Sequence, residues 1–218
     1  MLRRKEIPDF VYDPSCVLYL PLWKRDGLTF TSDDAYGHLA TVTDATHGIQ
    51  GRTFNGTSAK IAIPFHSSFN IATELTITFW VKYDVLTGDR CELFLGDLSG
   101  AWVFRRLDGQ SFGIYSAGWE YLAVATGFST GAWYQVTLTY DTAKLVSYYV
   151  NGALVTSTTF TKSLPTIDAG LTIANETDTA SFGSTFLDGT FGEVWLNNRA
   201  LTQLEIQHDM LATKWRYQ

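Results

Sequence analysis

The clearest alternation of apolar and polar residues runs through the second half of the chain, over residues 133–155. Tyr134, Val136 and Leu138 alternate with polar residues, which is the period-2 pattern of a strand with one buried face. After a polar turn, a second alternation ends at the dipeptide Asn151-Gly152. This dipeptide favours a type I′ hairpin turn, because both central residues of that turn need a positive φ. The pattern therefore predicts two β-hairpins that share one strand, with a second sheet covering their apolar face.

Short apolar runs and alternations recur along the rest of the chain, separated by turns that contain glycine. A first strand is expected over 17–20, and Pro21 places it near the edge of a sheet. The polar stretch 24–51 is expected to be a long loop, with a short hairpin inside it as the alternative. Other strands are expected at 51–54, 60–63, 75–83, 92–95, 102–105, 112–115, 121–125, 171–174 and 189–196.

One helix is expected near the end of the chain, over about residues 202–213. Thr202 can cap this helix, and Glu205 stands three residues later at the capping-box position. The apolar positions form an approximately helical stripe of Leu204, Ile206, Met210 and Leu211. Many short strands and this one short C-terminal helix predict an all-β fold, a two-sheet antiparallel jelly-roll sandwich.

The overall composition agrees with a single sandwich. We expect one β-sandwich domain over 16–218, preceded by an N-terminal arm at 1–15. Aromatic residues make up 15% of the chain, which suits a sandwich that keeps aromatic surface for partners. The net charge of −6 argues against nucleic acid as a partner, because phosphates need a basic patch. No apolar run reaches the ~18 residues of a membrane span.

Two features bear on the cellular compartment of the protein, namely its first residues and its two cysteines. Prolines and aspartates interrupt the basic start of the chain, so no signal peptide is expected. This favours location of the protein in a virion or in the cytoplasm. Export to the extracellular space by a non-classical route is the alternative. Cys16 and Cys91 each precede an apolar run, which favours two buried free thiols over a disulfide.

Five pieces of the sequence match a known family in order and near its spacing. They lie at 51–56, 75–81, 133–141, 149–152 and 191–206, and include Gly51-Arg52-Thr53-Phe54-Asn55-Gly56. Together they resemble the laminin-G-like jelly-roll domain of the concanavalin A-like lectin/glucanase superfamily, over roughly residues 15–210. The resemblance implies two antiparallel sheets packed face to face, one of them concave. It implies little about chemistry, because function on this fold depends on individual sites.

Some relatives carry a structural calcium, held by an acidic residue after the first strand and an Asp before the late Glu. The corresponding places in this chain are Trp23-Lys24 and Gly192, so both acids are missing. Calcium prefers several oxygen ligands with carboxylates among them. Five other acids are interpreted as solvated loop residues, and a different calcium site formed by them is the alternative. They are Asp26, Asp33, Asp34, Asp44 and Asp188. No cofactor is therefore expected, and Ca²⁺ stays as the alternative.

Glycoside hydrolysis on this fold needs two carboxylates flanking the scissile bond. Hydrolases of the superfamily place them at alternating positions of one strand, in an E-x-D-x-x-E type pattern that is missing here. Glu193 and Glu120 are each isolated, so we interpret both as hydrogen-bonded structural or surface acids. The four histidines show neither zinc spacing nor a nucleophile motif. The chain is therefore not expected to be an enzyme.

Carbohydrate recognition, as a non-catalytic adhesion module, is the first functional hypothesis. Sugars offer apolar C–H faces that stack on aromatic rings, while polar side chains fix their hydroxyls. Trp119 and Tyr121, close to Tyr115, lie in a stretch punctuated by glycine, and Trp102 follows a turn. Packing in or beside the core is the alternative for these four residues. It is the favoured interpretation for three other tryptophans, Trp80, Trp133 and Trp195.

The second hypothesis is a structural or assembly protein, such as a viral coat, decoration or tail component, or a filament subunit. Low charge with abundant threonine, serine and aromatic residues suits a surface that packs against copies of itself. Jelly rolls are frequent in capsids. The expected partners are accordingly a glycan, copies of the chain or other virion proteins.

Overall fold

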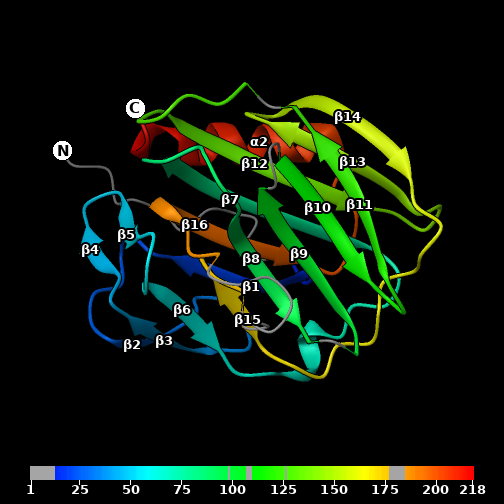
Figure 1. The fold of residues 1–218 in the computed structure, drawn as a ribbon, viewed down its shortest axis with the longest axis horizontal. Helices are drawn as coiled ribbons and strands as arrows, with labels where there is room; N and C mark the ends of the chain where they lie inside the picture. The colour runs from blue at the N-terminus through cyan, green and yellow to red at the C-terminus, as the bar shows by residue number, and fades with distance from the viewer. Residues whose placement is uncertain (1–12, 98, 107–109, 126, 177–184) are drawn as a thin grey trace.

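Two antiparallel β-sheets of eight strands each lie face to face, and a helix covers the outer side of one sheet (Figure 1). The computed structural model describes residues 13–97, 99–106, 110–125, 127–176 and 185–218. The predicted all-β, two-sheet sandwich with one short C-terminal helix is therefore confirmed. The predicted arm at 1–15 lies outside the described residues except for its last three.

Sheet A contains the hairpins on which the sequence is clearest. Its order is β14 (Ala153–Thr159), β13 (Leu145–Val150), β12 (Trp133–Tyr140), β7 (Leu75–Tyr83), β16 (Asp188–Asn197), β5 (Gly51–Asn55) and β4 (Thr46–Gly48), and β1 (Cys16–Pro21) pairs with β16. β13 is shared by two hairpins, as predicted. The turn residues Asn151 and Gly152 have φ values of 50° and 74°, which confirms the positive φ expected at both.

Sheet B packs against the inner face of sheet A. Its order is β11 (Trp119–Val124), β10 (Gln110–Tyr115), β9 (Ala101–Arg106), β8 (Arg90–Gly96), β15 (Leu171–Ile173), β6 (Lys60–Ile63), β3 (Leu39–Thr43) and β2 (Thr29–Thr31). The expectation of a plain long loop at 24–51 is wrong, and its alternative of a short hairpin is confirmed by the antiparallel pair β2–β3, while β4 also lies within this stretch. Phe30, Ala40 and Val42 each turn inward between exposed neighbours, which gives these short strands a buried face.

The main core lies between the sheets and is rich in aromatic rings. Phe79 of sheet A meets Phe104 of sheet B edge to face, with ring centroids 5.1 Å apart. Both side chains are fully buried, and each such burial contributes about 1.5–3 kcal/mol to folding. One acid is enclosed in this region. Glu92 accepts a hydrogen bond from the Tyr83 hydroxyl at 3.2 Å, and its side chain is buried.

The helix α2 (Gln203–Thr213) and the 3₁₀ turn η3 (Lys214–Arg216) cover the outer face of sheet A. The predicted capping box is present, because Thr202 and Glu205 bond to each other's backbone. A second aromatic cluster lies under this cover and contains Tyr19, Trp80, Trp195 and Tyr217, with Trp133 packed against it. The packing role expected for the three tryptophans is thus confirmed.

The apolar stripe predicted for the helix is only partly correct. Ile206 is buried and Met210 is half-buried, but Leu204 is 78% exposed and Leu211 is 56% exposed. Asp209 and Thr213 take the inward positions instead. Thr213 receives a hydrogen bond from the Trp80 indole at 2.8 Å, so a polar contact replaces part of the expected apolar one.

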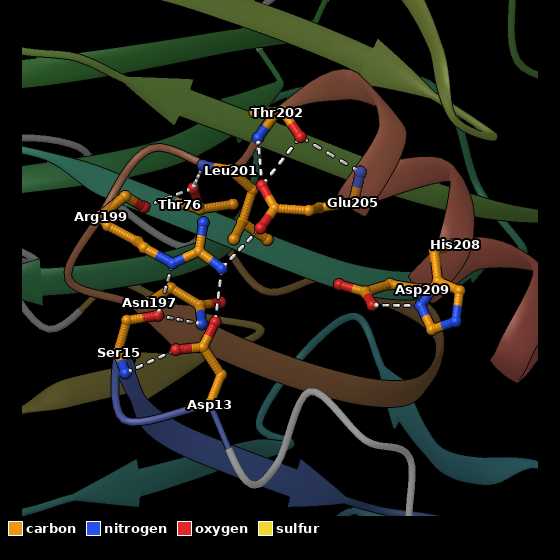
Figure 2. A network of polar contacts seen from close by, with 10 residues as sticks. All are labelled: Asp13, Ser15, Thr76, Asn197, Arg199, Leu201, Thr202, Glu205, His208 and Asp209. Carbon is orange, nitrogen blue, oxygen red and sulfur yellow. Dashed lines mark hydrogen bonds and ion pairs between the residues drawn. The ribbon is translucent and has the colours of Figure 1, made fainter.

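A polar network joins the start of the described chain to the start of α2 (Figure 2). The guanidinium of Arg199 bonds to the Asp13 carboxylate at 2.5 Å and to the Glu205 carboxylate at 2.8 Å. Ser15 receives hydrogen bonds from Arg199 and from the amide of Asn197. These contacts hold Asp13, the end of β16 and the helix N-terminus together as one corner of the domain.

The two cysteines are free and buried, so the predicted free thiols are confirmed. Burial raises the pKa of the Cys16 thiol to about 12, which keeps it protonated at neutral pH. In the described part of the chain, none of the helices combines the length and the apolar character required to cross a bilayer.

Candidate functional site

Three of the four predicted sugar-contacting residues gather on the outer face of sheet B. The hairpin of β10 and β11 places Tyr115 directly opposite Trp119, while Tyr121 follows two residues later on the same face. The ring centroids of Tyr115 and Trp119 are 5.2 Å apart with planes tilted by 58°. Those of Trp119 and Tyr121 are also 5.2 Å apart, and their planes are 15° from parallel. We name these three residues the aromatic patch.

A glycine under the rings makes this arrangement possible. Gly113 of β10 lies opposite Tyr121, and a Cβ at this position would stand 2.5 Å from Cε1 of Tyr121. It would also stand 3.2 Å from Cε3 of Trp119. Both rings therefore lean over bare backbone, which is a known use of glycine within a strand.

The aromatic patch is anchored on one side and open on the other. Tyr115 and Trp119 pack against a small apolar cluster on the same face, formed by Cys91, Phe94, Ala101 and Val103. Tyr121 is 38% exposed, and the other two rings are half-buried. Rings that are supported from below lose little side-chain entropy when a ligand binds.

A partly buried ion pair borders the aromatic patch. Arg105 of β9 donates from Nε to Asp89 at 2.7 Å and makes a second contact from its Nη2 to the same carboxylate. Desolvation by burial raises the pKa of Tyr121 to about 12, and the nearby Arg105 opposes this rise. The phenol is therefore a neutral hydroxyl at physiological pH, able to donate a hydrogen bond to a ligand.

Trp102 does not belong to the site, and its prediction is wrong. Its side chain is 1% exposed and lies in the core between the sheets. Side chains alternate along β9, so Trp102 and Phe104 point inward while Val103 and Arg105 point outward. A turn precedes Trp102, but its position within the strand determines its side of the sheet.

The two isolated glutamates serve structural roles, as predicted. Glu193 is fully buried and accepts hydrogen bonds from Tyr19, Trp23 and Tyr217, besides its ion pair with Arg216. Glu120 accepts hydrogen bonds from the backbone of Thr161 and Lys162 and so ties the loop after β14 to β11.

The places of the family's calcium ligands are filled by other side chains. A Cβ at Gly192 would collide with the ring of Tyr217, so an aspartate does not fit there. The guanidinium of Arg216 stacks on Trp23, 4.5 Å from the ring centroid, and supplies positive charge beside Glu193. Within the described residues, no group of three or more His, Cys, Asp or Glu side chains is arranged to hold a metal ion. The residues here therefore do not fit a calcium ion at that place.

Sequence reasoning missed Gly113 and the Arg105–Asp89 pair. The signal for Gly113 was present, since an isolated glycine inside a strand pattern indicates a close approach of another group. The ion pair had no such signal. Asp89 directly precedes β8 and Arg105 lies on β9, so the two residues meet only when these strands pair.

Comparison with known proteins identifies the fold family. The family model for the concanavalin A-like lectin/glucanases superfamily, of the laminin G type, matches residues 55–207, which is most of the chain. No curated protein matches the chain by sequence.

Several solved structures share the fold. Domain 4 of AbnA, a GH43 extracellular arabinanase from Geobacillus stearothermophilus, in complex with arabinotriose, matches 90% of this chain and 98% of its own, with a TM-score of 0.72 and 19% identity. The binding domain of botulinum neurotoxin serotype D matches 91% of this chain and 52% of its own, with a TM-score of 0.72 and 15% identity.

A third similar structure comes from botulinum neurotoxin type C, whose cell entry is described as dependent upon interaction with two ganglioside molecules. It matches 93% of this chain and 52% of its own, with a TM-score of 0.74 and 14% identity. This chain thus spans about half the length of the toxin chains. At these identities the likeness concerns the fold alone.

Proposed function

Because the chain belongs to the concanavalin A-like lectin/glucanases superfamily, we propose that it is a non-catalytic carbohydrate-binding module whose sugar contacts are made by the aromatic patch. One observation carries the proposal. Trp119 and Tyr121 present near-parallel rings over Gly113 on the outer face of sheet B, with Tyr121 38% exposed. Such rings can stack on the C–H face of a sugar, and the Tyr121 hydroxyl can bond to a sugar hydroxyl.

Two similar structures support this ligand class. The arabinanase domain is in complex with arabinotriose, and the type C toxin depends upon gangliosides, which carry sugars. The structural hydrogen bonds made by Glu193 and Glu120 support a role in binding without catalysis. Because Tyr217 and Arg216 fill the places of the calcium ligands, we further propose that binding needs no calcium and persists in EDTA.

Replacement of Trp119 tests the proposal directly. Trp119→Ala is expected to weaken glycan binding about 30-fold or more, because truncating an aromatic anchor at a binding site typically costs about 2 kcal/mol or more. Binding would be screened on a glycan array and the affinity for the best ligand measured by calorimetry. Trp215→Ala is the matched control, since Trp215 is 43% exposed on the opposite side of the domain. Equal affinities of the two variants would count against the aromatic patch.

A second candidate function, assembly of copies of this chain, is favoured by the outer side of α2. Leu204 and Leu211 are exposed, and their spacing of seven residues places them on one face of α2. The exposed Trp215 follows in η3. Ile206, Asp209 and Thr213 face the sheet on the opposite side. Exposed apolar side chains gathered on one face suit contact with the same face of a second copy. A place in a virus particle stays a prediction.

Light scattering tests assembly. If α2 joins two copies, the mass should rise above the 24.3 kDa of one chain as concentration increases. Leu211→Glu should return it to the monomer value, because a charge in an apolar interface is costly. A monomer at every concentration would exclude this candidate. The exposed Leu145→Glu, on β13, serves as the control substitution.

A further inference from the structure

Two adjoining pockets lie at the end of the sandwich near the 3₁₀ turn η2 (Ser67–Phe69) and share no residue with the aromatic patch. The first pocket has a volume of about 240 Å³, and its lining includes Tyr36, Ser68, Asn70, Ala72, Thr73 and Asn198. The second has a volume of about 200 Å³ and is lined by Ala72, Thr73, Tyr140, Thr142, Lys144 and Ser163. Ala72 and Thr73 form the wall between them.

One wall of the first pocket is an exposed aromatic ring held in place by its neighbours. Tyr36, in the β2–β3 loop, is 46% exposed. Its ring stacks on His38 at a centroid distance of 5.6 Å and is tilted against His66 at 5.4 Å. The Asp34 carboxylate accepts a hydrogen bond from the backbone N–H of Tyr36 at 2.8 Å and so fixes the loop. The ring is thus positioned before any ligand arrives.

The histidines behind Tyr36 are themselves fixed. His38 is buried, and its Nε2 lies 2.9 Å from the backbone carbonyl of Val17 and 3.3 Å from the Ser68 hydroxyl. The same hydroxyl lies 3.0 Å from Nδ1 of His66. His38 also stacks on Phe69, with centroids 4.6 Å apart. This packing ties the exposed Tyr36 ring to the domain core.

The other walls of both pockets carry hydroxyl groups, and those of the first pocket also carry the amides of Asn70 and Asn198. In the first pocket, the side-chain carbonyl of Asn70 accepts a hydrogen bond from the backbone N–H of Ile167 at 3.3 Å, which orients the Asn70 side-chain amide. In the second pocket, Lys144 donates to the carbonyl of Thr161 at 2.9 Å, which holds its chain along the rim. An aromatic face opposed by short polar side chains is the combination that recognises a sugar ring and its hydroxyls.

We propose that the two pockets are adjoining subsites for two successive residues of an oligosaccharide, forming a second carbohydrate site separate from the aromatic patch. Each pocket is smaller than the ~300 Å³ of sites that enclose a drug-sized ligand, which matches a single sugar ring in each. The shared Ala72–Thr73 wall spaces the two rings, with the first against Tyr36 and the second near Lys144. This inference rests on the proposed function, since it names a further site for the same ligand class.

Thr73→Trp tests the inference, because the exposed Thr73 borders both pockets and a bulky ring there would obstruct them together. Wild type, Thr73→Trp and Trp119→Ala would be compared on one glycan array. We expect a set of glycans whose signal falls at least tenfold in Thr73→Trp and is retained in Trp119→Ala. Thr158→Trp, at an exposed position on β14, is the matched control and should bind as the wild type does.

The array distinguishes this inference from the proposed function. Unchanged binding by Thr73→Trp, or loss of the same glycans in Thr73→Trp and Trp119→Ala, would overturn the separate site while the aromatic patch survives. A wild type that binds no glycan would overturn both proposals. If Thr73→Trp does not fold, Tyr36→Ala replaces it, since that change removes the aromatic wall without adding bulk, and the same loss is expected.

Discussion

Replacing Arg216 by methionine should lower the free energy of unfolding by about 3–5 kcal/mol, because it would leave a charge buried without its partner. That charge is the carboxylate of Glu193, whose side chain is fully buried on the outer face of sheet A. Hydrogen bonds from the Tyr19 hydroxyl and the Trp23 indole, both at 3.0 Å, would remain, but neither carries positive charge. The loss would be measured by chemical denaturation at neutral pH.

Two further variants separate the ion pair from simple loss of packing. The double variant Arg216→Met with Glu193→Gln removes both charges and should recover part of the stability lost by Arg216→Met alone. Arg25→Met is the matched control, because Arg25 pairs with Asp33 at a partly exposed site and should cost less than about 1 kcal/mol. An Arg216→Met protein as stable as Arg25→Met would show that the buried pair contributes little.

The second large effect concerns pH and the enclosed Glu92. Burial raises the pKa of this carboxyl from 4.5 to about 7, although the nearby Arg106 and the Tyr83 hydrogen bond oppose the rise. A raised folded-state pKa stabilises the fold at low pH, and this contribution is lost as pH rises through the folded value. Between about pH 4.5 and 7 the wild type should therefore lose roughly 3 kcal/mol of stability through Glu92.

Glu92→Gln should remove this pH dependence, because a glutamine is neutral at every pH and can still accept the Tyr83 hydrogen bond. Unfolding free energies of wild type and variant would be compared from pH 4.5 to 8. Burial also raises the pKa of Glu193 and Asp209, so only the difference between the two proteins isolates Glu92. A difference that stays constant across this range would contradict the assignment.

The elements that the sequence predicts well are those with long, regular patterns. The hairpins around Asn151-Gly152 and the capped helix starting after Thr202 follow from local chemistry that tertiary packing does not override. The strands β2 and β4 have three residues each, too few for an alternation to show. Each pairs with the next strand along the chain, β2 with β3 and β4 with β5, so the pairing is local but the strands are too short for the sequence to reveal it.

The three residues of the aromatic patch were predictable from the sequence, but their arrangement and the burial of Trp102 were not. Trp102 and Trp119 stand in similar surroundings in the sequence, yet one faces the core and the other the outside. Shifting a strand by one residue exchanges its two faces, so this distinction depends on register. The exposure of Leu204 and Leu211 likewise depends on which side of α2 faces the sheet, and that inward side carries the polar residues Asp209 and Thr213.

The corner held by Arg199 also determines how the protein can be displayed. Asp13 (Figure 2) and Tyr217, which precedes the C-terminal Gln218, both lie with α2 on sheet A, whereas the aromatic patch is on the outer face of sheet B. A carrier, bead or neighbouring module attached at Gln218 would therefore sit behind the sandwich and leave the patch facing outward. Copies anchored side by side in this way could engage a glycan-coated surface together, and such multivalent attachment raises avidity by about 10²–10⁴ without any new contact.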